Sequence, residues 1–153
     1  MAVVEFDQSI LGKEFVLGSF HVTEDMIKAF ARAVGETSPQ YVDPEAAKKT
    51  ASEGLIAPPI FYDVFRADQI PDPKVKFGKV SFNAGQRCEF HAPIRPGDTI
   101  TMKARITDIY EKTGRTGKMV FIVRETTYEN QKGEKVAVVE QSQVRRESGT
   151  ARE

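Results

Sequence analysis

The stretch DTITMKARITDIYE, residues 98–111, decides the fold class. Its apolar residues alternate with polar ones from Ile100 to Ile106, which is the period of a half-buried β-strand. Three more β-rich runs accompany it, at residues 80–92, 117–130 and 134–147. The connections between the four runs contain Gly, Pro and Asn, the residues that form turns. The C-terminal half therefore predicts an antiparallel meander.

The N-terminal half predicts one strand followed by helices. Residues 14–22 indicate an extended segment, and Thr23 then has the character of an N-cap for a helix that ends at Gly35. Asp43 and Pro44 indicate a second, short helix that runs to about Ser52. A third helix with a strongly apolar face is expected over PPIFYDVFRADQI, residues 58–70. This order of elements predicts an α+β fold in which an apolar helix packs on a curved sheet.

Composition limits the classes of function. The chain has 153 residues, which suits one domain over residues 1–147, and we expect the tail 148–153 to be disordered. The net charge is zero and no basic face is evident, which argues against a nucleic-acid partner. One cysteine and two histidines do not make a typical zinc site, so no metal is expected. Without a signal peptide or a long apolar segment, the expected location is the cytoplasm, with no membrane contact.

Three motifs resemble the MaoC-like dehydratase and hydratase family. They are FARAVGETSPQYVDPEAA at residues 30–47, GLIAPPIF at 54–61 and CEFHAPIRPGDTI at 88–100. The resemblance runs from about Gly12 to Arg145. It implies a hot-dog fold, in which an antiparallel β-sheet wraps around a central α-helix. The chain looks most like the non-catalytic, FAS1-like subunit of two-part (R)-specific enoyl-CoA hydratases and 3-hydroxyacyl-thioester dehydratases.

The resemblance also implies where an active site would lie. Active members carry Gly-Asp-x-Asn-Pro-(hydrophobic)-His-x-Asp, then Ala-His-Gly-Met. On this chain Glu36 falls on the catalytic Asp and Tyr41 falls on the catalytic His. Pro58 and Pro59 fall on the His-Gly pair, whose glycine N–H polarises the thioester carbonyl in active members.

These substitutions alter the chemistry. Glu36 keeps a carboxylate but moves it by one methylene, and small displacements can cost catalysis heavily. The Tyr41 phenol has a reference pKa of ~10 against ~6.5 for imidazole, so it is a poor base at neutral pH. Pro59 has no N–H to donate. We therefore expect the chain to be inactive alone, as part of a hydro-lyase complex.

Pro58, Pro59, Ile60, Phe61, Val64 and Phe65 are the candidate substrate-binding residues. They would line the path of an acyl chain carried as a coenzyme A or acyl-carrier thioester in fatty acid metabolism, with no other cofactor. The simpler interpretation is that most of them fill the core.

The resemblance implies a hetero-dimer or hetero-tetramer with a catalytic hot-dog subunit that supplies Asp and His. Alternatives are a self-sufficient homodimer or larger homo-oligomer that uses Glu36 and Tyr41, a non-enzymatic acyl-CoA binding module, and a thioesterase.

Other chemically capable residues carry weaker signals. Asp43 is better explained as an N-cap than as a catalyst. His21 and His91 are expected to be structural or at the surface, and Cys88 is expected to be inert. The thioester carrier's phosphates need cations, but the spacing singles out none of the candidates, which are Arg87, Arg95, Arg105, Arg115 and Lys118.

Overall fold

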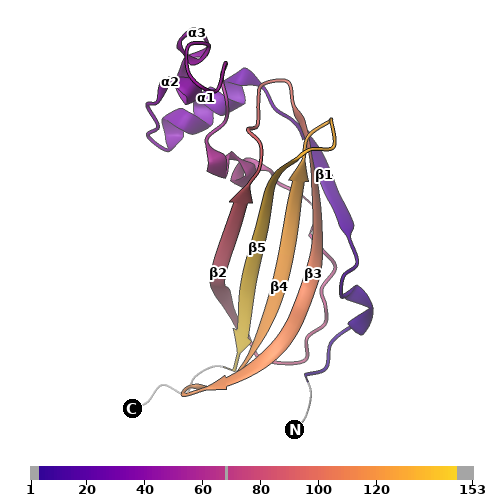
Figure 1. Ribbon diagram of the computed structural model, residues 1–153. Helices are drawn as coiled ribbons and strands as arrows, with labels where there is room; N and C mark the ends of the chain where they lie inside the picture. Colours follow the sequence, from indigo (N-terminus) through magenta and orange to yellow (C-terminus); the bar gives the residue numbers. More distant parts are fainter. Residues whose placement is uncertain (1–3, 68, 148–153) are drawn as a thin grey trace.

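The computed structural model describes residues 4–67 and 69–147, so the tail 148–153 lies outside the described residues. Five antiparallel strands form one curved sheet in the order β1-β3-β4-β5-β2 (Figure 1). The strands are β1 (Phe15–His21), β2 (Val80–Phe90), β3 (Thr99–Gly114), β4 (Gly117–Glu129) and β5 (Lys135–Arg146). The predicted α+β class is confirmed. The predicted meander holds for β3, β4 and β5, but β2 pairs with β5 rather than with β3, so the meander of all four runs was wrong.

The α-helices gather at one end of the sheet (Figure 1). They are α1 (Glu24–Ala33), α2 (Pro39–Val42) and α3 (Pro44–Ala47). Two 3₁₀ helices are also present: η2 (Pro59–Val64), and η1 (Gln8–Ile10), which lies away from the α-helices (Figure 1). Helix α1 begins as predicted, because the Thr23 hydroxyl accepts a hydrogen bond of 3.2 Å from the Met26 N–H. Gly35 follows its end with φ of 75°, a conformation that glycine adopts without the strain other residues incur.

The two later helices differ from the prediction. The second helix was expected to reach Ser52, but α3 ends at Ala47, where Thr50 bonds back to the Ala47 carbonyl and a turn replaces the helix. The segment expected to form a helix over residues 58–70 forms only the six-residue η2. Phe65 is already extended after η2, and Pro71 and Pro73 follow, so no hydrogen-bonded helix continues there.

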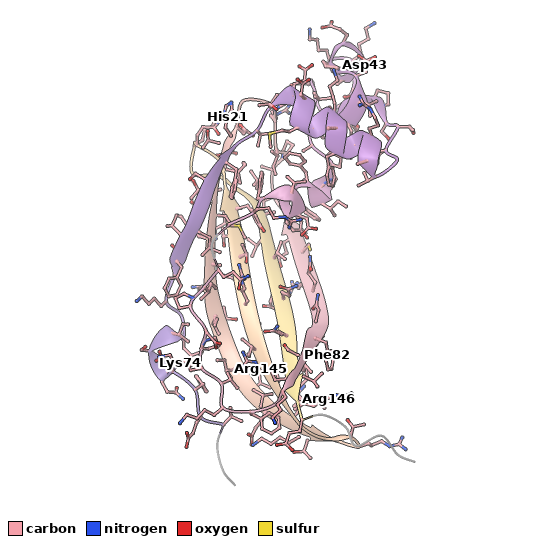
Figure 2. All side chains as sticks on the ribbon, turned by 180° about the vertical axis from the view of Figure 1, so that it is seen from behind. His21, Asp43, Lys74, Phe82, Arg145 and Arg146 are labelled. Atoms are coloured by element: carbon pink, nitrogen blue, oxygen red, sulfur yellow. The ribbon has the colours of Figure 1, made fainter. Side chains whose placement is uncertain are left out.

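Two clusters of buried side chains lie on one face of the sheet, which we call the inner face. The first cluster joins the sheet to α1 and η2, and Phe61, at 1% exposure, is its largest fully buried side chain. The second cluster lies toward the opposite end and joins β3 and β4 to the N-terminal segment and to Val75. Figure 2 shows the two ends, with Asp43 among the helices and with Phe82 and Arg146 at the far end. The helix expected over residues 58–70 would have extended from the first cluster toward the second.

Strand β2 forms one edge of the sheet, next to β5. Its residues are exposed along almost the whole length, including Phe82 and Phe90. Among the described residues, no helix is both long enough and apolar enough to cross a membrane.

Candidate functional site

Tyr41 and the two prolines line one cavity of about 270 Å³, which we call the proline cavity. Tyr41 comes from α2, and Pro58 and Pro59 come from the start of η2. The remaining walls come from Ile56 and Ala57, from residues 90–94 at the end of β2, and from Val136 and Ala137 of β5. Backbone hydrogen bonds close the walls, from Ile56 N–H to the Gln40 carbonyl and from Ala57 N–H to the Ile94 carbonyl. Residues more than fifty positions apart thus meet where the family resemblance places an active site.

Glu36 does not line the proline cavity. Its Oε1 accepts hydrogen bonds from the backbone N–H groups of Ser38, at 3.1 Å, and Thr37, at 3.0 Å. These bonds, that from Ser38 foremost, hold the pKa of the Glu36 carboxyl below its usual value. The side chain therefore stabilises the turn after α1, and its low basicity makes it a weak candidate for removing a proton from water.

Tyr41 and Pro59 leave the proline cavity poor in catalytic groups. The Tyr41 backbone N–H donates to the Ser38 carbonyl at 3.0 Å, and no hydrogen bond of its hydroxyl is found among residues 4–67 and 69–147. Pro59 has no N–H, and Pro58 beside it has none either. A hydration site needs an acid, a base and a donor for the enolate oxygen, and these three positions do not offer that set.

Pro58 and Pro59 line the proline cavity, and the other four candidate substrate-binding residues divide into three groups. Phe61 belongs to the buried core, where it makes edge-to-face contacts with Phe30 and Phe65 at 5.5 and 5.6 Å between ring centroids. Val64 packs against that core, and Ile60 is 51% exposed. Phe65 is buried, but it also lines a second and larger cavity.

The second cavity has a volume of about 660 Å³ and lies on the inner face between the two core clusters; we call it the sheet cavity. Part of its apolar wall comes from Phe65 and Ile70, in the connection from η2 to β2. The apolar side chains from the sheet are Met102, Ile106 and Ile122. Its polar residues include Arg124 of β4 and Gln141 and Gln143 of β5, the strand next to β2.

A polar group joins η2 to the edge strand. The Gln86 amide donates to the Tyr62 hydroxyl at 2.7 Å, and Tyr62 Oη lies 3.2 Å from Cys88 Sγ. Burial, together with the bond to Cys88, raises the pKa of Tyr62 above its usual value. Arg87 does not join this group and extends instead toward Glu89, at 2.8 Å. The group fastens η2 to β2.

Two residues of these cavities were missed by the sequence analysis. His91 was expected to be structural or at the surface, and it lines the proline cavity with its Nε2 3.7 Å from a Glu89 oxygen. Arg124 gave no signal, because a single arginine within a β-rich run usually faces water. Its run, residues 117–130, carries apolar residues on both faces, and Val120 and Ile122, four and two positions before it, proved to lie on the inner face.

Most of the candidate phosphate-binding cations are already paired. Arg105 binds Glu125 and Lys118 binds Glu111. Arg95 lies nearest to the proline cavity in the chain, next to Ile94, and donates to the Ser52 carbonyl at 2.7 Å. No group of three His, Cys, Asp or Glu side chains in residues 4–67 and 69–147 is arranged to hold a metal ion.

Comparison with known proteins fixes the class. A family model described as the FAS1-like dehydratase domain region matches residues 9–139, and the chain belongs to that family. A UPF0336 protein of Streptomyces avermitilis is 33% identical over 115 residues, covering 71% of this chain and 76% of that one. A probable enoyl-CoA hydratase alpha subunit of Thermomonospora curvata is 31% identical over 138 residues, covering 78% of this chain and 43% of that one.

Solved structures show the same fold. A MaoC-like dehydratase of Rhodospirillum rubrum superposes with a TM-score of 0.71 at 23% identity, covering 95% of this chain and 99% of that one. A chain of the C-terminally truncated HadBC complex of Mycobacterium tuberculosis, a 3R-hydroxyacyl-ACP dehydratase, gives 0.67 at 26% identity, covering 90% and 98%. The resemblance to the MaoC-like hot-dog family is thereby confirmed, and the chain is a dehydratase- or hydratase-type hot-dog protein.

Proposed function

We propose that this chain is the non-catalytic subunit of an (R)-specific enoyl-thioester hydratase or 3-hydroxyacyl-thioester dehydratase. A partner hot-dog chain supplies the Asp and His pair, and this chain shapes the pocket for the acyl group. The observation that carries the proposal is the proline cavity, which brings together Tyr41, Pro58 and Pro59, the residues that the family resemblance aligns with the catalytic His and the His-Gly pair.

The exposed edge of the sheet supports a partner chain. An unpaired strand of this length normally needs a cover, because its free N–H and C=O groups otherwise recruit other chains. Strand β2 offers eleven residues at the edge, and Phe90 at its end lines the proline cavity. A chain paired along β2 would therefore lie beside that cavity. The relative from Thermomonospora curvata is described as an alpha subunit, and the HadBC structure is a complex, which agrees with this arrangement.

The sheet cavity supports a role in holding the acyl group. Its apolar residues, among them Phe65 and Ile122, give a hydrocarbon chain a surface to cover, and each buried CH₂ contributes about 0.8 kcal/mol. The carrier is a coenzyme A or acyl-carrier thioester, and the reaction needs no further cofactor. Of the candidate substrate-binding residues, Phe65 is the one that meets this surface directly.

One observation favours a second candidate, a self-sufficient homo-oligomeric hydratase. His91 is an imidazole at the proline cavity, next to the Glu89 carboxylate, and it could replace the base that Tyr41 does not provide. Glu36 would then serve as the second carboxylate despite its distance from the cavity wall.

The deciding experiment measures hydration of trans-2-enoyl-CoA by the purified chain, by a co-expressed catalytic hot-dog subunit encoded beside it, and by the two together. We expect turnover that is highest for the pair and absent for this chain alone. In the pair, Glu36→Gln, Tyr41→Phe and His91→Gln should each leave kcat within about twofold. Turnover by the chain alone that Glu36→Gln or His91→Gln abolishes would establish the homo-oligomeric enzyme instead. Saturable binding with no turnover in any combination would leave only a binding module.

A further inference from the structure

The sheet cavity contains a polar patch at a place where a hot-dog core is expected to be apolar. Arg124 on β4 is the direct cross-strand neighbour of Gln141 on β5. Two pairs further along, Gln143 lies between Ile122 of β4 and Asn83 of β2. All of these side chains line the same cavity, and Met102 and Ile106 of β3 lie beside them. The patch is therefore rich in N–H donors and is bordered by hydrocarbon.

Arg124 is a half-buried cation that forms no ion pair with another described residue. Its Nε is inaccessible to water and has no hydrogen-bond partner in that part of the chain. Burial lowers the pKa of its guanidinium from the usual value, which reflects the cost of keeping the charge in the cavity. By contrast Arg105 and Arg87, on the opposite face of the sheet, lie 2.8 Å from glutamate oxygens.

The described lining of the cavity carries an excess of positive charge. Its described lining holds three arginines, Arg66, Arg124 and Arg145, and a single carboxylate, Asp72. Asp72 lies 3.7 Å from Arg145, whose Nη1 also donates to the Val75 carbonyl at 3.1 Å. The Asp63 carboxylate lies in an adjoining pocket that Arg124 and Gln141 also line, but it forms no ion pair with Arg124 in the described part of the chain. A guanidinium with a buried, unpartnered Nε costs free energy that an anionic ligand would recover.

From this cluster we infer that the sheet cavity binds acyl groups that carry a second, remote carboxylate, with Arg124 as the residue that selects them. The inference rests on the proposed function for the thioester and deepens it by naming the substrate class. The planar guanidinium can bind both oxygens of a carboxylate, and the amides of Gln141 and Gln143 can donate to the remaining lone pairs. The methylene chain between the carboxylate and the thioester would lie on Phe65, Met102 and Ile122.

The test uses four probes that differ only in the remote group and the carrier. Two are thioesters, decanoyl-CoA and the mono-CoA thioester of decanedioic acid, and two are the free acids, decanoate and decanedioate. Calorimetric titration gives their dissociation constants for the full-length chain, for Arg124→Met and for Arg105→Met. Arg105→Met is the matched control, because it removes the same charge from the outer face of the neighbouring strand. Thermal melts of each variant check that it is folded.

We expect the wild-type chain to bind the acid-ended thioester at least about tenfold more tightly than decanoyl-CoA, as a charge-assisted bond to a carboxylate would provide. Arg124→Met should remove this preference and Arg105→Met should keep it. Arg124→Lys, which keeps the charge and loses the planar fork, should retain part of it.

The other outcomes separate the two proposals. Equal binding of both thioesters, or a preference that persists in folded Arg124→Met, overturns this inference and leaves the proposed function intact. Arg124-dependent binding of decanedioate without binding of either thioester overturns the proposed function and keeps the carboxylate site. Absence of binding by all four probes overturns both.

Discussion

Truncation of Phe61 separates a core residue from a substrate-binding one. The ring is 1% exposed and touches Phe30 and Phe65. Phe61→Ala removes roughly 100–150 Å² of buried apolar surface, which at ~25 cal/mol per Å² corresponds to ~2.5–4 kcal/mol. The cavity left behind raises the expected loss to ~3–5 kcal/mol. For a chain of this length, ~4 kcal/mol lowers Tm by roughly 8–16 °C.

Urea unfolding and thermal melts measure this loss, and Ile60→Ala is the matched control. Ile60 belongs to the same 3₁₀ helix but is 51% exposed, so its truncation should cost less than ~1 kcal/mol. Phe61→Leu, which keeps most of the volume, should leave the acyl-chain preference of the active complex unchanged. A cost for Phe61→Ala no greater than that for Ile60→Ala would refute the conclusion that η2 is anchored through this ring. A changed acyl preference in Phe61→Leu would return Phe61 to the substrate path.

Three further predictions concern the supports of the site. Asp43→Ala should lower the free energy of unfolding by ~1 kcal/mol, because Asp43 Oδ1 accepts hydrogen bonds from the Glu45 and Ala46 N–H groups. Asp43→Asn should keep most of this cap, and equal urea midpoints for the wild type and both variants would contradict the prediction. Gly78→Ala should lower the free energy of unfolding by ~1–3 kcal/mol more than Gly133→Ala. The two glycines have matching φ values of 75° and 76°, but a Cβ at Gly78 would meet Arg146 backbone atoms at 2.8 Å, whereas one at Gly133 would meet nothing within 4 Å. Equal losses of stability in thermal melts would argue against that clash. Burial raises the pKa of Tyr128 to about 12. Its neutral phenol therefore contributes stability that is fully present below the unfolded pKa of ~10 and is lost as pH rises toward about 12. Ultraviolet titration of the wild-type chain and of Tyr128→Phe should show that this phenol ionises above the other tyrosines, and its ionisation near pH ~10 would contradict the prediction.

The sheet was predictable because its signals are local. Alternation in residues 98–111 and turn residues between the runs fix strand positions without tertiary information. Strand β4 shows the limit of that signal, because it lies inside the sheet and is apolar on both faces. Phe121 stacks on Tyr110 on the outer face, while Val120 and Ile122 lie in the inner cluster. Periodicity alone therefore does not identify the inner face of β4, and Arg124 went unnoticed.

The helices were less predictable because short ones depend on their ends. Thr23 and Gly35 bounded α1 correctly, since both signals act within one turn. The apolar pattern of residues 58–70 fits either a long helix or a short one followed by an extended chain. Packing of Phe61 and Phe65 against the sheet, together with the prolines that follow, favours the short one. Such competition between local propensity and tertiary contacts is not visible in the sequence.

The candidate site was predicted in part. The motif spacing identified Tyr41, Pro58 and Pro59, and the structure brings those three to one cavity. Glu36 belongs to the same motif, but its carboxylate accepts hydrogen bonds from the Thr37 and Ser38 backbone N–H groups. That arrangement depends on the backbone geometry after Gly35, which the motif does not contain. His91 joins the cavity because β2 pairs with β5, so that the His91 N–H bonds to the Val136 carbonyl. A contact of that kind depends on strand register, which motif spacing does not contain.

The short length of η2 and the polar residues of the inner face have a common physical explanation. A long helix in its place would cover the inner face and would need apolar side chains opposite it, because an unpaired polar group under a helix is costly. The sheet instead presents Arg124, Gln141 and Gln143 there, and the chain crosses the face as the extended segment that contains Ile70 and Pro71. The short η2 and the polar inner face are therefore consistent with each other, because a longer helix would bury these polar side chains without hydrogen-bond partners. Restoring an apolar inner face with Arg124→Met should accordingly stabilise the isolated chain, while removing its ability to distinguish a carboxylate-bearing acyl group.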